Sequence, residues 1–168
     1  MTFSDTELTI LGLNLIFPSY AKLTLFAALF GAIVGIEREW KQKVASIRTF
    51  AIISSGSCLF ACLSHAAAGA SVPNMPYDVT RVAAGIVTGI GFLGGGVIFK
   101  NEEGIEGITT GAMIWFVAAV GMACGFNQVS FAAWGILVYT IIMMGSKPMY
   151  GSISFIKKQM WGEEEDES

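Results

Sequence analysis

The stretch "GIVTGIGFLGGGVIFK", residues Gly85 to Lys100, decides between two folds because it contains the spacing Gly89-x-Gly91-x-x-Gly94. In a soluble enzyme this spacing is typical of a loop that holds the pyrophosphate of a dinucleotide. Such a loop needs a preceding strand, a following helix and an acidic residue about 20 positions further on. Here the glycines lie inside one continuous apolar run, and no strand pattern leads into it. We therefore interpret the stretch as part of a membrane helix and reject the nucleotide site.

The composition of the whole chain supports this interpretation. Of its 168 residues, 54% are apolar and only 14% are charged, against about 25% charged residues in typical globular chains. Several apolar runs approach or reach the roughly 20 residues that a helix needs to cross a bilayer. We predict an all-α, polytopic membrane protein with five transmembrane helices and glycine-rich packing. The predicted spans are Tyr20–Ile36, Ile47–Ala67, Val79–Phe99, Ile108–Phe126 and Val129–Ser146.

The predicted organisation has three parts. Residues 1–19 form an N-terminal interfacial segment, because the apolar run Leu8–Phe17 is too short to span and ends at Pro18. Residues 20–147 form the membrane domain, and residues 148–168 form a cytoplasmic tail without a soluble C-terminal domain. The tail ends in GEEEDES, a run typical of a solvated segment, with contact to a basic partner as the alternative. No removable signal peptide is expected.

Basic residues predict the orientation of the chain. Five spans place eight of the ten lysines and arginines on one side of the membrane, and this side is therefore expected to be cytoplasmic. The N-terminus then lies outside and the C-terminus inside. The eight residues are Arg38, Lys41, Lys43, Arg48, Lys100, Lys147, Lys157 and Lys158; Lys22 and Arg81 lie on the other side.

Glycine has a use in lipid, where it lets helix backbones approach closely. The spacing Gly-x-x-x-Gly recurs across the predicted spans, which favours a compact bundle. The three consecutive glycines at 94–96 leave two alternatives open: close packing alone, or a local break in the helix that frees carbonyl groups toward a cavity. The glycines assigned to helix packing are Gly31, Gly35, Gly85, Gly89, Gly91, Gly94, Gly95, Gly96, Gly107, Gly111, Gly121 and Gly125.

Polar residues from separate spans are predicted to meet at the cytoplasmic edge, where the N-termini of the second and fourth helices favour a carboxylate or a bound anion. We favour a paired network over simple anchoring at the interface, because acidic residues add little to anchoring. The predicted cluster is Glu37, Arg38, Glu39, Arg48, Thr49, Asn101, Thr109 and Thr110. At the outer edge, the i, i+3 spacing of Asp78 and Arg81 predicts an ion pair.

Other chemistry finds little support in the sequence. Cys58, Cys62 and Cys124 fall inside predicted spans and are interpreted as small packing residues rather than metal ligands. His65 is a lone histidine near the outer end of the second span. We predict no catalytic residues, no metal, no cofactor and no nucleic-acid partner, and therefore no enzyme.

Three segments carry a resemblance to a known family: GAIVGIEREWKQKVASIRT (Gly31–Thr49), DVTRVAAGIVTGIGFLGGGVI (Asp78–Ile98) and GITTGAMIWFVAAVGMACG (Gly107–Gly125). They resemble the MgtC/SapB family of bacterial inner-membrane proteins, which have a five-helix membrane domain. The chain departs from the family pattern at Phe50, where histidine is frequent, and at Gly95 and Gly111, where alanine is common. Longer members add a soluble C-terminal domain.

The resemblance implies a role in adaptation to low magnesium and in virulence, with restraint of the membrane ATP synthase. Two functions follow as hypotheses: a non-enzymatic regulator that contacts another membrane protein, or a transporter or channel for magnesium or another ion. Mg²⁺ prefers carboxylate and water oxygens, and no acidic residue falls near the middle of a predicted span. We therefore favour the regulator. Self-association is also expected, because the glycine-lined faces exceed what one bundle buries.

Overall fold

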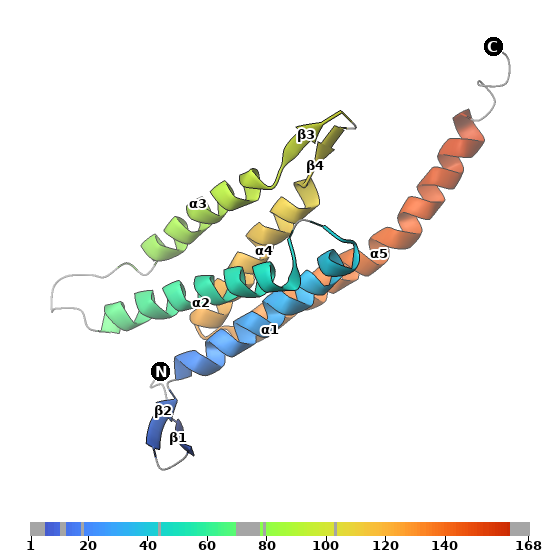
Figure 1. Cartoon of the computed structure of the whole chain (residues 1–168). Helices are drawn as coiled ribbons and strands as arrows, with labels where there is room; N and C mark the ends of the chain where they lie inside the picture. Colours follow the sequence, from blue (N-terminus) through green and yellow to red (C-terminus); the bar gives the residue numbers. More distant parts are fainter. Residues whose placement is uncertain are drawn as a thin grey trace. The chain divides into compact units, whose positions relative to one another are not determined.

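The computed structural model describes residues 6–10, 13–17, 19–43, 45–69, 78, 80–102 and 104–161, with side chains for residues 20–43, 45–67, 78, 80–102 and 104–145. The described residues contain five helices and two short hairpins (Figure 1). The helices are α1 (Ser19–Trp40), α2 (Ile47–Gly69), α3 (Thr80–Gly96), α4 (Ile108–Gly125) and α5 (Val129–Trp161).

The five helices confirm the predicted all-α class. Three of them contain segments long and apolar enough to cross a membrane, namely Tyr20–Trp40, Ile47–Ala67 and Ile108–Gly125. The helix α3 has 17 residues, and the apolar part of α5 covers Val129–Gly145. Three ends differ from the prediction by three residues or more: α1 continues past Ile36 to Trp40, α3 stops at Gly96 instead of Phe99, and α5 continues past Ser146 to Trp161.

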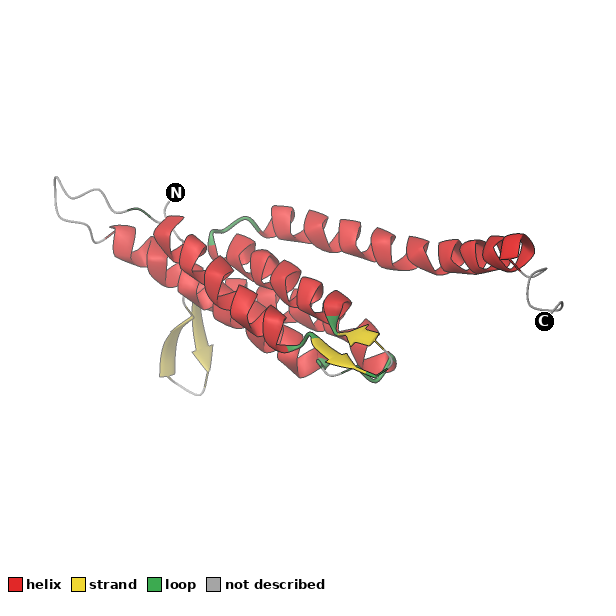
Figure 2. Ribbon diagram, turned by 90° about the horizontal axis from the view of Figure 1, so that it is seen from above, coloured by secondary structure: helices red, strands yellow, loops and turns green. Residues whose placement is uncertain are grey.

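Two antiparallel hairpins were not predicted. Strands β1 (Thr6–Ile10) and β2 (Leu13–Phe17) pair with Thr6 opposite Phe17, so the apolar run before α1 is extended rather than helical. Strands β3 (Phe99–Asn101) and β4 (Gly104–Glu106) pair with Phe99 opposite Glu106 and join α3 to α4 (Figure 2). The glycine run at 94–96 therefore marks the end of a helix, where the chain turns into this second hairpin.

The chain divides into two compact units, residues 1–133 and 134–168, with the division inside α5. In the first unit, α1, α2 and α4 pack against one another, while α3 packs along α4 and touches α2 only sparsely. The second unit is helical as far as Trp161.

The core of the first unit consists mainly of small and medium side chains from α1, α2 and α4, and Phe50 of α2 is the largest side chain that is fully buried in it. Ala27 and Val34 of α1, Cys58 of α2, and Val117 and Cys124 of α4 are fully buried. Many other large apolar side chains lie on the outside. The exposed ones on these three helices and α3 include Leu25, Phe26, Leu29, Ile52, Leu59, Phe60, Leu63, Phe92 and Trp115. A contiguous exposed apolar surface is costly in water, and this distribution is what a bilayer solvent favours.

Glycines set the distance between α2 and its two neighbours. A Cβ added at Gly31 of α1 would lie 2.5 Å from the carbonyl oxygen of Phe50 on α2. A Cβ at Gly121 or Gly125 of α4 would collide with the carbonyl oxygens of Ser54 and Cys58, also on α2. Because these positions have no side chain, the helix backbones pack in direct contact. Helices in lipid have no hydrophobic driving force between them, so the van der Waals energy of this contact stabilises the bundle instead.

Candidate functional site

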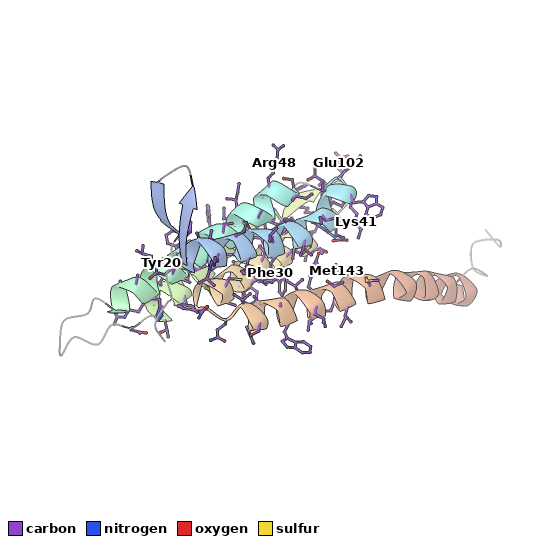
Figure 3. All side chains as sticks on the ribbon, turned by 90° about the horizontal axis from the view of Figure 1, so that it is seen from below. Tyr20, Phe30, Lys41, Arg48, Glu102 and Met143 are labelled. Atoms are coloured by element: carbon purple, nitrogen blue, oxygen red, sulfur yellow. The ribbon has the colours of Figure 1, made fainter. Side chains whose placement is uncertain are left out.

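Most charged side chains described in the first unit gather at one end, which we call the polar end. It comprises the C-terminus of α1, the N-termini of α2 and α4, and the β3–β4 hairpin. Figure 3 shows Lys41 and Glu102 toward this end, with Tyr20 at the opposite end of α1. The N–H and C=O groups at helix termini have no partner within the helix. The polar side chains therefore lie beside backbone groups that can form hydrogen bonds with them.

A charged network on α1 forms the centre of the polar end. Arg38 donates from Nε to Oε2 of Glu37 at 2.9 Å, and from Nη2 to Oε1 and Oε2 at 2.8 and 2.7 Å. The ammonium group of Lys41, one turn further along α1, also pairs with Glu37. Arg38 is only 5% exposed. A buried guanidinium needs such a carboxylate, because an uncompensated buried charge is strongly destabilising.

The way α1 ends brings a second cation beside Arg38. Gln42 has a φ of 49°, and the Lys43 amide donates to the Arg38 carbonyl at 3.1 Å while the Gln42 amide donates to the Glu39 carbonyl at 3.1 Å. These two bonds with a left-handed residue define a Schellman motif, in which the side chains at the positions of Arg38 and Lys43 are frequently apolar neighbours. Here both are cationic.

Two other residues of the predicted cluster cap α2. The carboxylate of Glu39 accepts a hydrogen bond from the Ile47 amide at 3.2 Å, and the Thr49 hydroxyl accepts one from the Ser46 amide at 3.4 Å. Both satisfy backbone donors at the start of α2, where negative charge is also favoured by the helix dipole. Glu39 therefore links the end of α1 to the start of α2, and Thr49 caps α2 locally.

The β3–β4 hairpin contributes the next polar pair. Asn101 of β3 donates from Nδ2 to Oε1 of Glu106 on β4 at 3.1 Å. Gly107 follows with a φ of 87° and serves as the N-cap of α4 without a side-chain hydrogen bond. A side chain at Gly107 would be strained by this left-handed backbone and would collide with the Val97 carbonyl.

A cavity of about 330 Å³ lies where these parts meet. Its charged and hydroxyl-bearing walls come from Arg38 at the end of α1, Lys43 after it, Glu106 of β4, and Thr109 and Thr110 in the first turn of α4. Thr110 is buried, whereas Thr109 is exposed. Apolar residues and the N-cap complete the wall: Val97, Phe99, Ile105, Gly107 and Ile108.

Arg48 does not join this arrangement. The predicted network included it, but within the described side chains Glu37 pairs with Arg38 and Lys41. Arg48 is exposed on the first turn of α2 and points away from the bundle (Figure 3). The reason is local: Lys41 directly follows α1 at position i+4 from Glu37, where its ammonium group pairs with this carboxylate. The i, i+4 spacing of Glu37 and Lys41 in the sequence could have indicated that these two residues pair.

The pair predicted for the outer edge lies at the start of α3. Arg81 Nε is 3.7 Å from Asp78 Oδ2, and both side chains are exposed. Asp78 Oδ1 also accepts hydrogen bonds from the Thr80 hydroxyl at 2.6 Å and the Thr80 amide at 2.9 Å. These hydrogen bonds, with the nearby charge of Arg81, lower the pKa of Asp78. Asp78 is thus an N-terminal cap for α3.

The predicted packing glycines fall into two groups. Those at helix or hairpin contacts leave no room for a Cβ without a shift or a tight contact: Gly31, Gly35, Gly94, Gly107, Gly111, Gly121 and Gly125. The others meet no atom within 4 Å: Gly85, Gly89, Gly91, Gly95 and Gly96. All five of the open glycines lie on α3, which is therefore the helix with the most unoccupied small-residue surface.

Part of that surface forms an apolar groove of about 530 Å³ between α2 and α3, which the sequence analysis missed. Gly56 of α2 and Gly85 and Gly89 of α3 line it, and none of the three meets an atom within 4 Å of its Cβ position. The other lining residues are Ile52, Ile53, Ser57, Phe60, Val82, Ile86, Ile90 and Leu93. Gly94 of α3 contacts Gly111 of α4, and α3 packs along α4 but only sparsely against α2, which leaves the groove between α2 and α3 open.

The three cysteines are free and buried. Cys62 donates to the Gly125 carbonyl at 3.6 Å, so it lies at the contact of α2 with α4. Within the described ranges, no three residues of the types His, Cys, Asp and Glu are grouped as a metal site.

A helical chain with a small-residue core, large apolar side chains outside and polar groups gathered at the helix ends is a polytopic membrane protein. This chain belongs to the MgtC family, whose model matches residues 24–151. It is 38% identical to Protein MgtC of Salmonella typhimurium (strain 14028s / SGSC 2262) over 130 residues, which are 77% of this chain and 51% of the relative. It is 42% identical to Protein MgtC of Brucella abortus (strain 2308) over 107 residues, or 64% of this chain and 42% of that protein.

The chain thus spans about half the length of the curated relatives it matches. No solved structure matches it.

Proposed function

We propose that this chain is a non-enzymatic regulator in a bacterial inner membrane, and that it binds a transmembrane helix of another membrane protein in the α2–α3 groove. The observation that carries the proposal is the groove itself, with Gly56, Gly85 and Gly89 open along its two walls. Glycines on a helix face let a partner backbone approach closely enough for extensive van der Waals contact.

The resemblance to the MgtC/SapB family supplies the first partner to test, which is the membrane part of the ATP synthase. It also supplies the context, which is adaptation to low magnesium or virulence. The basic asymmetry of the sequence supports a cytoplasmic polar end with the N-terminus outside. Self-association stays a prediction, and Gly91, Gly95 and Gly96 offer open surface for it outside the groove.

A magnesium or other ion transporter is the alternative function. The buried hydroxyls of Ser54, Ser57 and Ser64 on α2 are the feature that favours it, because they place polar atoms inside the bundle. Transport of Mg²⁺ usually uses carboxylates and retained water. The described acidic side chains, however, lie at helix ends or in the hairpin: Glu37, Glu39, Asp78, Glu102 and Glu106. The regulator is therefore the better supported of the two.

The proposal is tested by filling the groove. ATP-driven proton pumping is measured in vesicles that contain ATP synthase with this chain, with Gly89→Leu, or with Gly91→Leu. Gly91 is the matched control, because it is equally open but does not line the groove. The wild-type chain and Gly91→Leu should lower pumping, and Gly89→Leu should not. An inactive wild-type chain would exclude ATP synthase as the partner, and equal inhibition by both variants would exclude the groove.

A further inference from the structure

The cavity at the polar end has an excess of positive charge that the protein leaves only partly neutralised. Arg38 and Lys43 line it, and Glu106 is the one carboxylate among its described lining residues. Glu37 neutralises Arg38 from the side but shares its charge with Lys41. Because the Schellman motif places Arg38 and Lys43 as neighbours, two cations converge where such motifs frequently have an apolar contact.

The guanidinium group of Arg38 is used incompletely. Its Nε and Nη2 atoms donate to Glu37, but within the described residues Nη1 makes no hydrogen bond. The residue is 5% exposed and lines the cavity. Among the described residues, Ser54 Oγ is the one fully buried side-chain polar atom without a hydrogen-bond partner, so Nη1 of Arg38 reaches solvent and is available to a ligand in the cavity that this residue lines.

The start of α4 adds backbone donors to the same cavity. The first amides of a helix have no intrahelical acceptor, and α4 has neither a side-chain cap nor an acidic residue in its first turn. Thr109 and Thr110 of that turn line the cavity. Amides at a helix N-terminus together with a partial positive charge favour an anion.

We propose that this cavity binds a phosphate group, held by Arg38 Nη1, the Lys43 ammonium group and the first turn of α4. The volume of about 330 Å³ is roughly ten times the space of one water molecule in the liquid, which leaves room for the group and its hydration. The planar guanidinium and the ammonium are the side chains that proteins use for phosphate oxygens. Glu106, which also lines the cavity, would suit the ammonium of an ethanolamine headgroup, so the phosphate can come from a phospholipid or from free phosphate.

Thermal denaturation of the purified full chain in detergent tests the proposal, since a ligand that binds the folded state raises the midpoint. One arm titrates sodium phosphate and the other a short-chain phosphatidylethanolamine, both at constant ionic strength set with chloride. Stabilisation by phosphate alone identifies a free anion, stabilisation by the lipid alone identifies a headgroup, and either result supports the proposal. Stabilisation by neither overturns it.

Substitutions locate the site. Lys43 is exposed, so Lys43→Gln should fold normally and raise the apparent Kd about tenfold, as expected for the loss of one charge-assisted hydrogen bond. Lys100→Gln is the matched control, because Lys100 is also an exposed lysine of the polar end but does not line the cavity. An unchanged Kd in Lys43→Gln, or an equal rise in both variants, would contradict the site.

Discussion

At the scale of single residues, the decisive interaction is the pair of Glu37 with Arg38. Glu37 holds two donor nitrogens of Arg38 through contacts of 2.7 to 2.9 Å. The side chain of Arg38 is 6% exposed and that of Glu37 is 21% exposed. The guanidinium is therefore the member that depends on its partner, because solvent reaches it least.

Loss of Glu37 should accordingly be far more damaging than loss of Arg48. Glu37→Gln leaves the buried guanidinium uncompensated, and we expect a loss of about 3 kcal/mol, the lower end of the range for a broken buried pair, because Glu37 is partly solvated. Arg48→Gln should change stability by less than about 0.5 kcal/mol, as for other exposed surface positions. Unfolding free energies in mixed detergent measure both. Equal losses would show that Arg48 is part of the network after all.

At the scale of elements, the first unit is held by direct backbone contact between helices. The spacing of glycines predicted such contact, and the spans predicted from hydropathy agree with the helices to within a few residues, except that α5 continues past Ser146 to Trp161. The partners of each glycine could not be predicted, since they depend on the rotation of each helix about its axis. For the same reason, nothing in the sequence distinguished Gly94, which touches Gly111, from Gly95 and Gly96, which touch nothing.

The end of α3 and the hairpin after it were also not predictable from hydropathy. Val97, Ile98 and Phe99 continue the apolar run, although the helix has already ended. Two features of the sequence could have indicated that the helix ends early. One is the run of helix-destabilising glycines before Val97, and the other is the pair Gly104 and Gly107, which both adopt a positive φ in the structure. The Schellman motif at the end of α1 was likewise not predictable, because its left-handed position is occupied by Gln42 rather than by the usual glycine.

Adding one methyl group to a contact glycine should separate α1 from α2. In Gly31→Ala the new Cβ would lie 2.5 Å from the Phe50 carbonyl oxygen and 2.8 Å from Ser54 Cβ, so we expect a loss of about 1–3 kcal/mol, as for other overpacked cores. Gly91→Ala, with nothing within 4 Å, should be neutral or stabilising by up to about 1 kcal/mol. Thermal midpoints in detergent compare them. A stable Gly31→Ala with an unstable Gly91→Ala would contradict the helix packing described.

At the scale of the whole molecule, the first unit combines a closely packed bundle with two openings of different chemistry. The apolar groove lies between α2 and α3, and the polar cavity lies at the end of the unit. The charged residues and the ends of the apolar runs can be read from the sequence, and they predicted a polar end. Neither the groove nor the cavity could be predicted, because both depend on how the helices pack against one another. An apolar groove suits a partner helix, whereas an ion path would need polar groups along its length.

The central claim is that this chain acts on another membrane protein and does not itself move ions. Its most direct test is flux of Mg²⁺, Na⁺ and H⁺ in proteoliposomes that contain only this protein, compared with protein-free liposomes. We expect the two fluxes to be indistinguishable for all three ions, because the described acidic side chains lie at helix ends and in the hairpin rather than along the bundle. Saturable flux of any one of them would contradict the account and establish a transporter.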